Sequence, residues 1–455
     1  MKKLLFLFSL LCSLHVMAQV NEDSLFIRRI ADEILTNGQS YDNLRQLTRK
    51  VGARLAGSPA SYKAEAWGLN AMNNAGADKA WLQECMVPHW VRGAKESAVF
   101  VYGKNRLPLN VLALGNSEGT GGKKIKAPVI EVTSFDDLEK KKEQVKGKIV
   151  FYNYAFVPTF IRTFHSYGDA VKYRSDGASR AAKYGAVGVI IRSMSHSTDN
   201  HPHTGSLHYN DSFPKIPALA VGLQHADKLS TLLKNNKGII EMISNARNLP
   251  DTIGHNVIGE ITGSEFPNEY ITIGGHIDSW DTGEGAHDDG AGCVQSIEVL
   301  NVLKKLGYKP RRSIRAVLFA NEENGLRGGT AYAKQAKEKN EKHYFALESD
   351  AGGFTPRGFG FSGSDAQLKK VQAWLPLLVP YQTAFINKGG GGADIGPLNG
   401  TFGTPVAGLE PDTQRYFDVH HSPGDVFEAV NKRELELGAI NMAALIYLVD
   451  KYGLE

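Results

Sequence analysis

The feature that most constrains the fold is a run of glycine, histidine and aspartate that directly follows a short apolar segment. The segment, residues 270–273, reads Tyr-Ile-Thr-Ile, which is typical of a buried strand. The run after it, residues 274–292, reads GGHIDSWDTGEGAHDDGAG and leads into a helical pattern. Open α/β sheets place their chemistry at the carboxyl ends of strands, so His276 and Asp288 are candidate ligands of one metal site. A histidine buried in the core beside a solvated acidic turn would have the same residue pattern, and this stretch alone leaves both interpretations open.

The rest of the C-terminal half of the chain repeats this arrangement of a strand followed by ligand-type residues. From residue 256 onward strand-like and helix-like segments alternate, and the strands end in acidic residues or are followed by histidine. Successive β-α-β units predict an α/β fold with a mostly parallel mixed sheet and helices on both faces. Five ligand-type side chains at strand ends are the pattern of a two-metal site. These five are His276, Asp288, Glu323, Asp350 and His420.

A different composition in the middle of the chain predicts a second domain. With 455 residues the chain is long enough for two or three domains. Residues 104–250 have strands and helices of their own and contain none of the five candidate ligands. We expect them to form an inserted α/β domain, so that residues 19–103 and 251–455 together make a discontinuous catalytic domain. The histidines between 196 and 208 are expected to lie in a solvated loop of this insert.

The N-terminus has the pattern of a secretory signal peptide. Lys2 and Lys3 precede an apolar stretch, residues 4–14, and Val16 and Ala18 supply small residues before a cleavage point. We therefore expect residues 1–18 to be removed and the protein to be secreted or periplasmic. The apolar stretch is too short to span a bilayer, so no membrane anchor is expected.

Composition and the remaining motifs exclude other classes. A net charge of +4 with interspersed signs is too small to indicate nucleic-acid binding. Cys85 and Cys293 are the two cysteines of the mature chain; they form no disulfide framework, although a single bridge between them stays open. Residues 115–119, GNSEG, match the G-x-S-x-G nucleophile elbow, but glycines and lysines follow instead of the helix that this motif requires.

The ordered motifs resemble a known family. H-x-D, D-D-G-A-G, E-E, a strand-end E-S-D and H-H-S-P-G-D follow one another as in the co-catalytic zinc aminopeptidases of the M28 type. Within that family the sequence around HIDSWDTGEGAHDDGAG is most similar to the carboxypeptidase Q (plasma glutamate carboxypeptidase) group. Residues 104–250 resemble a protease-associated domain. The resemblance covers nearly all of the mature chain and implies the zinc aminopeptidase fold with a protease-associated insert.

The resemblance also implies a ligand set for two zinc ions per chain, with manganese or cobalt as substitutes. One ion would be held by His276, Asp350 and a bridging Asp288, and the other by Asp288, Glu323 and His420. Asp288 takes the bridge rather than Asp289, and the peptide bond between them is often cis in this family. His421 is the alternative to His420.

Two further residues receive roles from the same resemblance. Glu322 would be the general base that activates a water molecule, and Asp278 would orient His276. The implied function is that of a secreted dinuclear zinc exopeptidase that hydrolyses small peptides, chiefly dipeptides with free termini; a homodimer is compatible with it. A broad aminopeptidase, a single-zinc glutaminyl cyclase and an inactive binding relative are the alternatives, and retention of every ligand favours the enzyme.

A preference for a free C-terminus would need a group that binds a carboxylate. Lys388, with the backbone amides of residues 389–392, is one candidate, and Arg415 is another. Each also has a purely structural interpretation.

Overall fold

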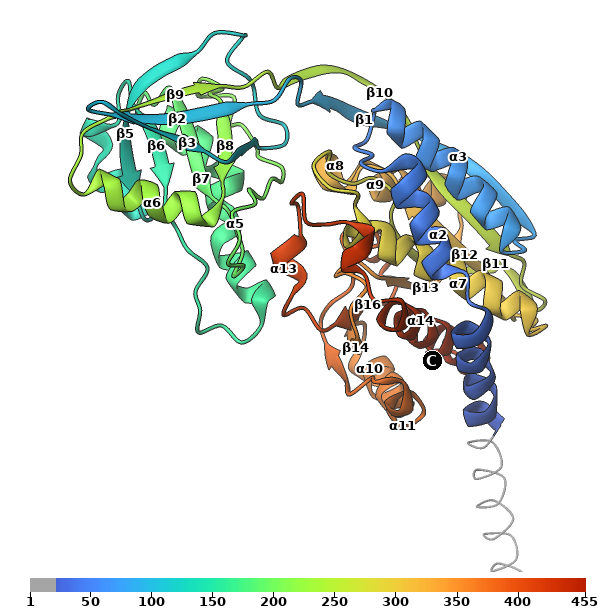
Figure 1. Cartoon of the computed structure of the whole chain (residues 1–455). Helices are drawn as coiled ribbons and strands as arrows, with labels where there is room; N and C mark the ends of the chain where they lie inside the picture. Colours follow the sequence, from blue (N-terminus) through green and yellow to red (C-terminus); the bar gives the residue numbers. More distant parts are fainter. Residues whose placement is uncertain (1–21) are drawn as a thin grey trace, which may run out of the picture.

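The structure, a computed structural model, describes residues 22–455 and contains two eight-stranded sheets with flanking helices (Figure 1). The expected signal peptide, residues 1–18, lies outside the described residues. Within residues 22–455 no helix is both long and apolar enough to cross a membrane. Cys85 and Cys293 are both buried and free, so the bridge left open by the sequence is not formed.

The first sheet has the strand order β1-β10-β12-β11-β13-β16-β14-β15. Its central strands β12, β11, β13 and β16 are parallel, whereas β1, β10 and β14 join their inner neighbours antiparallel. The expected mostly parallel mixed sheet is thereby confirmed. The strands are β1 (Lys79–Val91), β10 (Arg247–Ile261), β11 (Phe266–His276), β12 (Arg312–Phe319), β13 (Lys342–Glu348), β14 (Pro356–Ser362), β15 (Phe385–Lys388) and β16 (Val406–Pro411).

Helices cover both faces of this sheet. Every residue of β12 is buried, and its side chains alternate between two apolar clusters. Ile314 and Leu318 pack in the large cluster with the helix over residues 22–37 and with α3 (Pro59–Asn74), α7 (Ala291–Lys305) and α14 (Lys432–Tyr452). Val317 and Phe319 point the other way, toward α9 (Arg327–Glu338) and α12 (Gly396–Phe402). Burial on both faces explains why such strands read as continuous apolar runs.

Helix α7 shows how the sequence sets the element next to the motif-rich loop. Val294, Ile297, Leu300 and Leu303 recur every three residues and are buried, so the helix presents one apolar face to the core. It ends at Lys305, and Gly307, which follows the C-cap residue Leu306, has a φ of 68°, the left-handed conformation that glycine tolerates just after a helix. Helix α7 thus begins directly at the end of the loop that carries Asp288.

The second sheet has the order β3-β2-β9-β5-β6-β7-β8-β4, with parallel pairing from β5 to β8. Helices α4 (Phe135–Lys140), α5 (Thr163–Ala182) and α6 (Leu223–Leu233) accompany it. Its strands are β2 (Ser97–Tyr102), β3 (Asn105–Leu109), β4 (Val111–Ala113), β5 (Ile125–Val132), β6 (Ile149–Tyr152), β7 (Gly188–Arg192), β8 (Ala218–Val221) and β9 (Ile239–Ile243).

Strand pairing shifts the expected domain boundaries at 104 and 250. Strand β2 lies before residue 104 yet pairs with β3 and β9 in the second sheet. Strand β10 begins at Arg247 and pairs with β1 in the first sheet. We therefore call residues 97–243 the second unit and residues 22–91 with 247–455 the first unit. Figure 1 shows the second unit joined to the first through the long ribbon of β1 and β10.

The two units share buried apolar contacts. Phe354, Tyr416 and Phe417 of the first unit pack in a cluster made mostly of second-unit side chains. Trp90 and Trp280 of the first unit pack in a second cluster that is also made mostly of second-unit side chains. Tyr416 and Phe417 belong to α13 (Tyr416–Val419), which Figure 1 shows beside the second unit. These contacts fix the second unit against the loops at the carboxyl edge of the first sheet.

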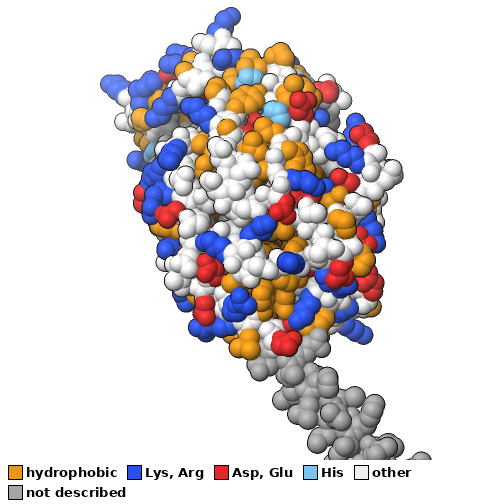
Figure 2. Space-filling view, turned by 90° about the vertical axis from the view of Figure 1, so that its right-hand side faces the viewer, with side chains coloured by type: hydrophobic (Ala, Val, Ile, Leu, Met, Phe, Trp, Pro, Cys, Tyr) orange, Lys and Arg blue, Asp and Glu red, His pale blue; other side chains and the backbone are white. Residues whose placement is uncertain are grey.

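Charges of both signs are mixed on the outer surface. On the face shown in Figure 2, basic and acidic side chains alternate with apolar ones. On this face the charged residues of both signs that make up the net charge of +4 over 455 residues are intermixed.

Candidate active site

The sheet brings the candidate ligands to one edge. His276 is the last residue of β11, Glu323 follows β12 in α8 (Glu322–Gly325), and Asp350 follows β13. Because these three strands are parallel neighbours, their carboxyl ends lie side by side. The Nε2 atom of His276 lies 3.2 Å from Oδ1 of Asp288 and 3.4 Å from Oδ1 of Asp350. These three residues form one group able to hold a metal ion.

A second group forms on the other side of Asp288. The Nε2 atom of His421 is 3.2 Å from Oδ2 of Asp288 and 3.1 Å from Oε2 of Glu323. The Nε2 atom of His420 is 3.6 Å from the same oxygen of Asp288. The two histidine rings stack with their centroids 3.5 Å apart. Asp288 therefore belongs to both groups, with one carboxylate oxygen facing each.

The loop that carries Asp288 is held by two neighbouring carboxylates. Asp425 accepts hydrogen bonds from the backbone N–H groups of His287 and Asp288. Asp289 accepts them from the N–H groups of His276 and Gly292. The Asp288–Asp289 peptide bond is cis, as the family resemblance implies. Asp289 is therefore occupied in holding the loop, which leaves the metal-facing position to Asp288.

Asp278 contacts His276 through its backbone carbonyl oxygen and Glu322 through its carboxylate. The Nδ1 atom of His276 lies 3.0 Å from the backbone carbonyl oxygen of Asp278, whereas the Asp278 carboxylate is 3.7 Å away. That carboxylate accepts the backbone N–H of Glu322 at 3.0 Å instead. With Nδ1 engaged, Nε2 of His276 is left facing the carboxylates, which is the orientation that a ligand needs.

The buried charges fit a bound cation. Burial, and then the negative charge of Asp288, raises the pKa of Glu323 to about 7. Burial, and then the charges of Asp350 and Glu323, raises the pKa of Glu322 well above its usual range. Among the described residues the Oδ2 atom of Asp288 is buried and accepts no hydrogen bond. A set of carboxylate oxygens and imidazole nitrogens without thiolate suits zinc, so these residues fit the metal that the sequence implies.

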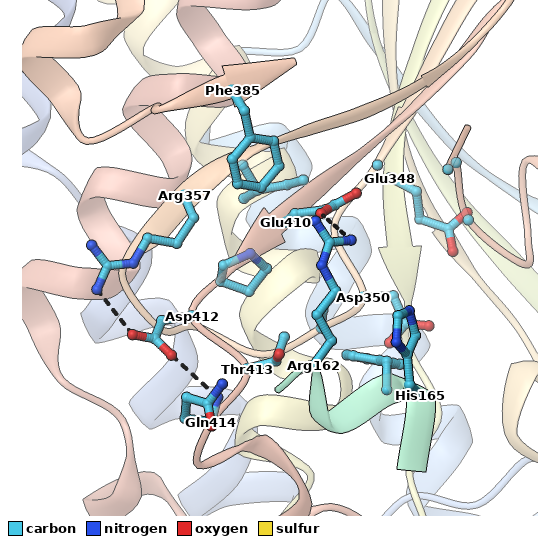
Figure 3. Close-up of a pocket in the computed structure, with 18 residues that line it drawn as sticks. Arg162, His165, Glu348, Asp350, Arg357, Phe385, Glu410, Asp412, Thr413 and Gln414 are labelled. Carbon is cyan, nitrogen blue, oxygen red and sulfur yellow. Dashed lines mark hydrogen bonds and ion pairs between the residues drawn. The ribbon is translucent and has the colours of Figure 1, made fainter. Parts of the chain in front are cut away.

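A cavity of about 490 Å³ opens onto Asp350 (Figure 3). The second unit contributes Arg162 and His165, at the start of α5, and the first unit contributes the outer strands β14 and β16 with residues 390–392. Figure 3 shows Arg162 extending toward Glu410, where its Nη1 atom lies 3.9 Å from Oε2. The other charged residues that line the cavity are Glu348, Arg357 and Asp412.

The two basic side chains singled out from the sequence lie elsewhere. Lys388 is exposed and pairs with Asp365 at 2.8 Å. Arg415 pairs with Glu434 at 3.1 Å, and its guanidinium lies over the ring of Phe354. Neither lines the cavity. Sequence reasoning missed Arg162 because no local signal marks a residue that only the packing of the second unit brings to this place.

Comparisons with known proteins point to one family of peptidases. The model of peptidase family M28 matches residues 256–446. Carboxypeptidase Q of Homo sapiens is 36% identical over 412 residues, which cover 90% of this chain and 85% of the human protein. Carboxypeptidase Q of Xenopus laevis is 35% identical and covers 90% of this chain and 86% of that protein.

Solved structures show the same fold. The peptidase M28 precursor from Shewanella amazonensis SB2B superposes with a TM-score of 0.90 and 32% identity, covering 96% of this chain and 99% of that one. A zinc aminopeptidase from Bacillus subtilis reaches a TM-score of 0.65 at 20% identity, covering 90% and 94%, and shares the fold. The extent of these matches leads to one conclusion: the chain belongs to peptidase family M28 and is a metallopeptidase.

Proposed function

We propose that this protein is an exported dinuclear zinc exopeptidase that hydrolyses small peptides, chiefly dipeptides with free termini. The observation that carries the proposal is the sharing of Asp288 between two groups of side chains whose ligand atoms lie close enough together to hold a metal ion. A carboxylate with one oxygen toward each group is how two metal ions are held close enough to act on one bond.

The proposed ligands differ at one position from the set that the sequence implied. His276, Asp350 and Asp288 would hold one ion, and Asp288 and Glu323 the other, together with one histidine of the adjacent pair. The distances favour His421, which is near both Asp288 and Glu323, over His420, which is 3.6 Å from Asp288. His420 and His421 are adjacent in sequence, so only the local backbone decides between them.

The chemistry divides between the ions and the chain. When bound, the ions would polarise the scissile carbonyl and make a water molecule more acidic. Glu322 would take that proton and deliver it to the leaving amine, and its buried surroundings, which raise the pKa of its carboxyl group, make its carboxylate a stronger base. Asp278 holds the backbone of Glu322 and, through its carbonyl, the ring of His276.

The cavity suggests how a dipeptide would be recognised. The free amine would lie beside the carboxylates of Asp350 and Glu348, which line the cavity. Arg162 would receive the terminal carboxylate, because within residues 22–455 its guanidinium has a loose ion pair with Glu410 as its one charged partner and its side chain is 57% exposed. This replaces the two candidates from the sequence, both of which are paired outside the cavity.

A comparison of free and C-terminally amidated dipeptides tests the substrate proposal. We expect free dipeptides to be cleaved much faster, and Arg162→Ala to narrow that difference by raising KM for the free form. Lys388→Ala is the matched control, since it removes an exposed cation outside the cavity and should leave the ratio unchanged. Equal rates on free and amidated dipeptides with the unaltered protein would identify a plain aminopeptidase.

The catalytic proposal is tested by Glu322→Gln. This change removes the base but none of the proposed ligands, so the protein should keep two zinc ions while activity falls by about 10²–10⁴-fold. Zinc content and turnover are measured on the same preparation. Near-normal turnover would remove Glu322 from this role, and loss of zinc would make it a ligand instead.

A further inference from the structure

The second unit contacts the segments that carry the candidate metal ligands at two separate points. One contact reaches the pair His420–His421, and the other reaches the segment that carries Glu322 and Glu323. The inference drawn from them rests on the proposed dinuclear site and concerns how that site is held together.

The first contact is a pair of hydrogen bonds between Thr204 and His421. The N–H of Thr204 donates to the carbonyl oxygen of His421 at 2.9 Å, and Nδ1 of His421 lies 3.2 Å from the carbonyl oxygen of Thr204. Nδ1 of His203 is 2.7 Å from the carbonyl oxygen of His420. A hydrogen bond from one ring nitrogen of a histidine fixes the ring and leaves the other nitrogen free to bind a metal. The Thr204 carbonyl thus turns Nε2 of His421 toward Asp288 and Glu323.

Several buried groups hold Thr204 itself in place. Its Oγ1 donates to the carbonyl oxygen of Ala113 at 2.8 Å. Arg174 reaches its carbonyl oxygen at 3.4 Å and is tied to the hydroxyl of Tyr167 at 2.7 Å. Gly205, the next residue, leaves no room for a side chain, because a Cβ there would lie 2.4 Å from the Arg174 guanidinium. The carbonyl that faces His421 is therefore fixed on the side of the second unit.

The second contact uses residues 115–119, the segment that matches a nucleophile elbow in sequence only. The side-chain amide of Asn324, which directly follows Glu323, donates to Oδ1 of Asn116 at 3.1 Å, and the side-chain amide of Asn116 donates to the backbone carbonyl oxygen of Asn324 at 3.3 Å. Gly115 receives the ring of Trp280, since a Cβ at this position would lie 1.8 Å from that ring. The backbone N–H of Trp280 in turn donates to Glu323 at 3.2 Å. This segment therefore acts through Asn324 and Trp280 on Glu323.

We propose that the second unit is a structural part of the metal centre and that Thr204 and Asn116 are positioning residues for His421 and Glu323. The ion held by these two ligands would then depend on the second unit. The ion held by His276 and Asp350 would not, because the contacts of His276 lie within the first unit. The geometry thus predicts two ions of unequal sensitivity to changes in residues 97–243.

The test measures zinc affinity in the full chain, stripped of metal and titrated against a chelating dye. Thr204→Val keeps the shape of the side chain but removes its hydrogen bond to Ala113, whereas Thr204→Ser keeps that bond. We expect Thr204→Val and Asn116→Ala to weaken one of the two zinc equivalents by about 10–100-fold and to leave the other unchanged. Thr204→Ser should bind both ions as the unaltered protein does.

Asn248→Ala is the matched control for Asn116→Ala. It removes the exposed hydrogen bond between Asn248 and Glu118, two residues along from Asn116, without touching Asn324 or Trp280. It should leave both affinities unchanged. The visible absorption of the cobalt-loaded protein provides a second readout, because it reports ligand geometry and should change only with Thr204→Val and Asn116→Ala.

The outcomes separate this inference from the proposed function. Full affinity for both ions in Thr204→Val and Asn116→Ala would overturn the inference, and so would equal weakening of both ions, which indicates general loss of structure. A single zinc equivalent in the unaltered protein would defeat the dinuclear proposal instead. If the unaltered protein binds a single ion, the inference is also overturned when Thr204→Val binds that ion with unchanged affinity.

Discussion

At the scale of single residues, the site depends on which of two adjacent histidines faces the metal. His421 has a φ of 58°, the left-handed conformation that non-glycine residues seldom adopt, and its ring lies against both Asp288 and Glu323. His420 instead packs its ring among Tyr167, Tyr416 and Phe417. Neighbouring residues of one type thus have different surroundings.

We therefore expect His421→Ala to retain about one zinc equivalent and His420→Ala to retain two. The physical reason is that the ring of His421 is the nearer to both carboxylates, while His420 mainly fills an aromatic pocket. Metal analysis of the two purified variants checks this. Two full equivalents in His421→Ala, with one in His420→Ala, would restore the assignment first made from the sequence.

Asp288 gives a second prediction at this scale. Because its two oxygens face different groups, Asp288→Ala should lose zinc from both positions, whereas Asp350→Ala should lose it from one. Zinc content after dialysis against a dilute chelator distinguishes the two variants. Two equivalents retained in Asp288→Ala would rule out the bridge.

At the scale of elements, α7 couples the site to the helices beneath it. It starts at the end of the Asp288 loop and carries Glu298, which is buried and accepts hydrogen bonds from the backbone N–H of Gln39 and from Asn301. Burial raises the pKa of Glu298 to about 7. The unfolded chain gives up this proton at a lower pH, so the stability associated with the neutral group is present at low pH and is lost as pH rises toward 7.

Glu298→Gln should remove this pH dependence. The variant is expected to gain stability relative to the unaltered protein as pH rises from about 4.5 to about 7, by up to about 3 kcal/mol, and to gain nothing below that range. Urea unfolding at pH 5 and pH 8, at a fixed zinc concentration, measures the difference. A difference between the two proteins that is the same at both pH values would contradict it.

At the scale of the whole molecule, the acidic centre opposes folding unless it is neutralised. Burial, and then the charge of Asp288, raises the pKa of Glu323 to about 7, and burial, and then the charge of Asp350, raises the pKa of Glu348 to about 7. A carboxyl group whose pKa is raised on folding costs stability as pH increases through that window. A bound cation offsets this cost, and binding to the folded state alone stabilises it by mass action.

Removal of metal should therefore lower the melting temperature, and by more at pH 8 than at pH 5. The carboxyl groups are largely protonated at the lower pH and largely charged at the higher one. Thermal unfolding with and without a chelator at both pH values checks this, and re-addition of zinc should restore the midpoint. An equal shift at both pH values would show that the charges at this site are not what the metal offsets.

The sequence predicts most of the site because strand ends converge. His276 ends β11, and Glu323 and Asp350 follow β12 and β13 within a few residues, so the parallel strands place all three at one edge of the sheet. The choice of His421 could not be predicted, since it depends on one backbone torsion and on Thr204, more than 200 residues away. The sequence offers Lys388 as a candidate for binding a substrate carboxylate because no local signal marks its ion pair with Asp365.

The ribbon of β1 and β10 has a further consequence. Val91 and Arg247 are partners across it, so the chain leaves the first sheet and returns to it at one point. An ordinary two-residue hairpin turn joins strands that are this close. The whole intervening segment is thus topologically a long hairpin loop, which could be exchanged, shortened or replaced without changing the register of a single strand in the first sheet. Grafting the corresponding segment of a relative therefore needs only two junctions, one after Val91 and one before Arg247, and the two lie side by side in the structure.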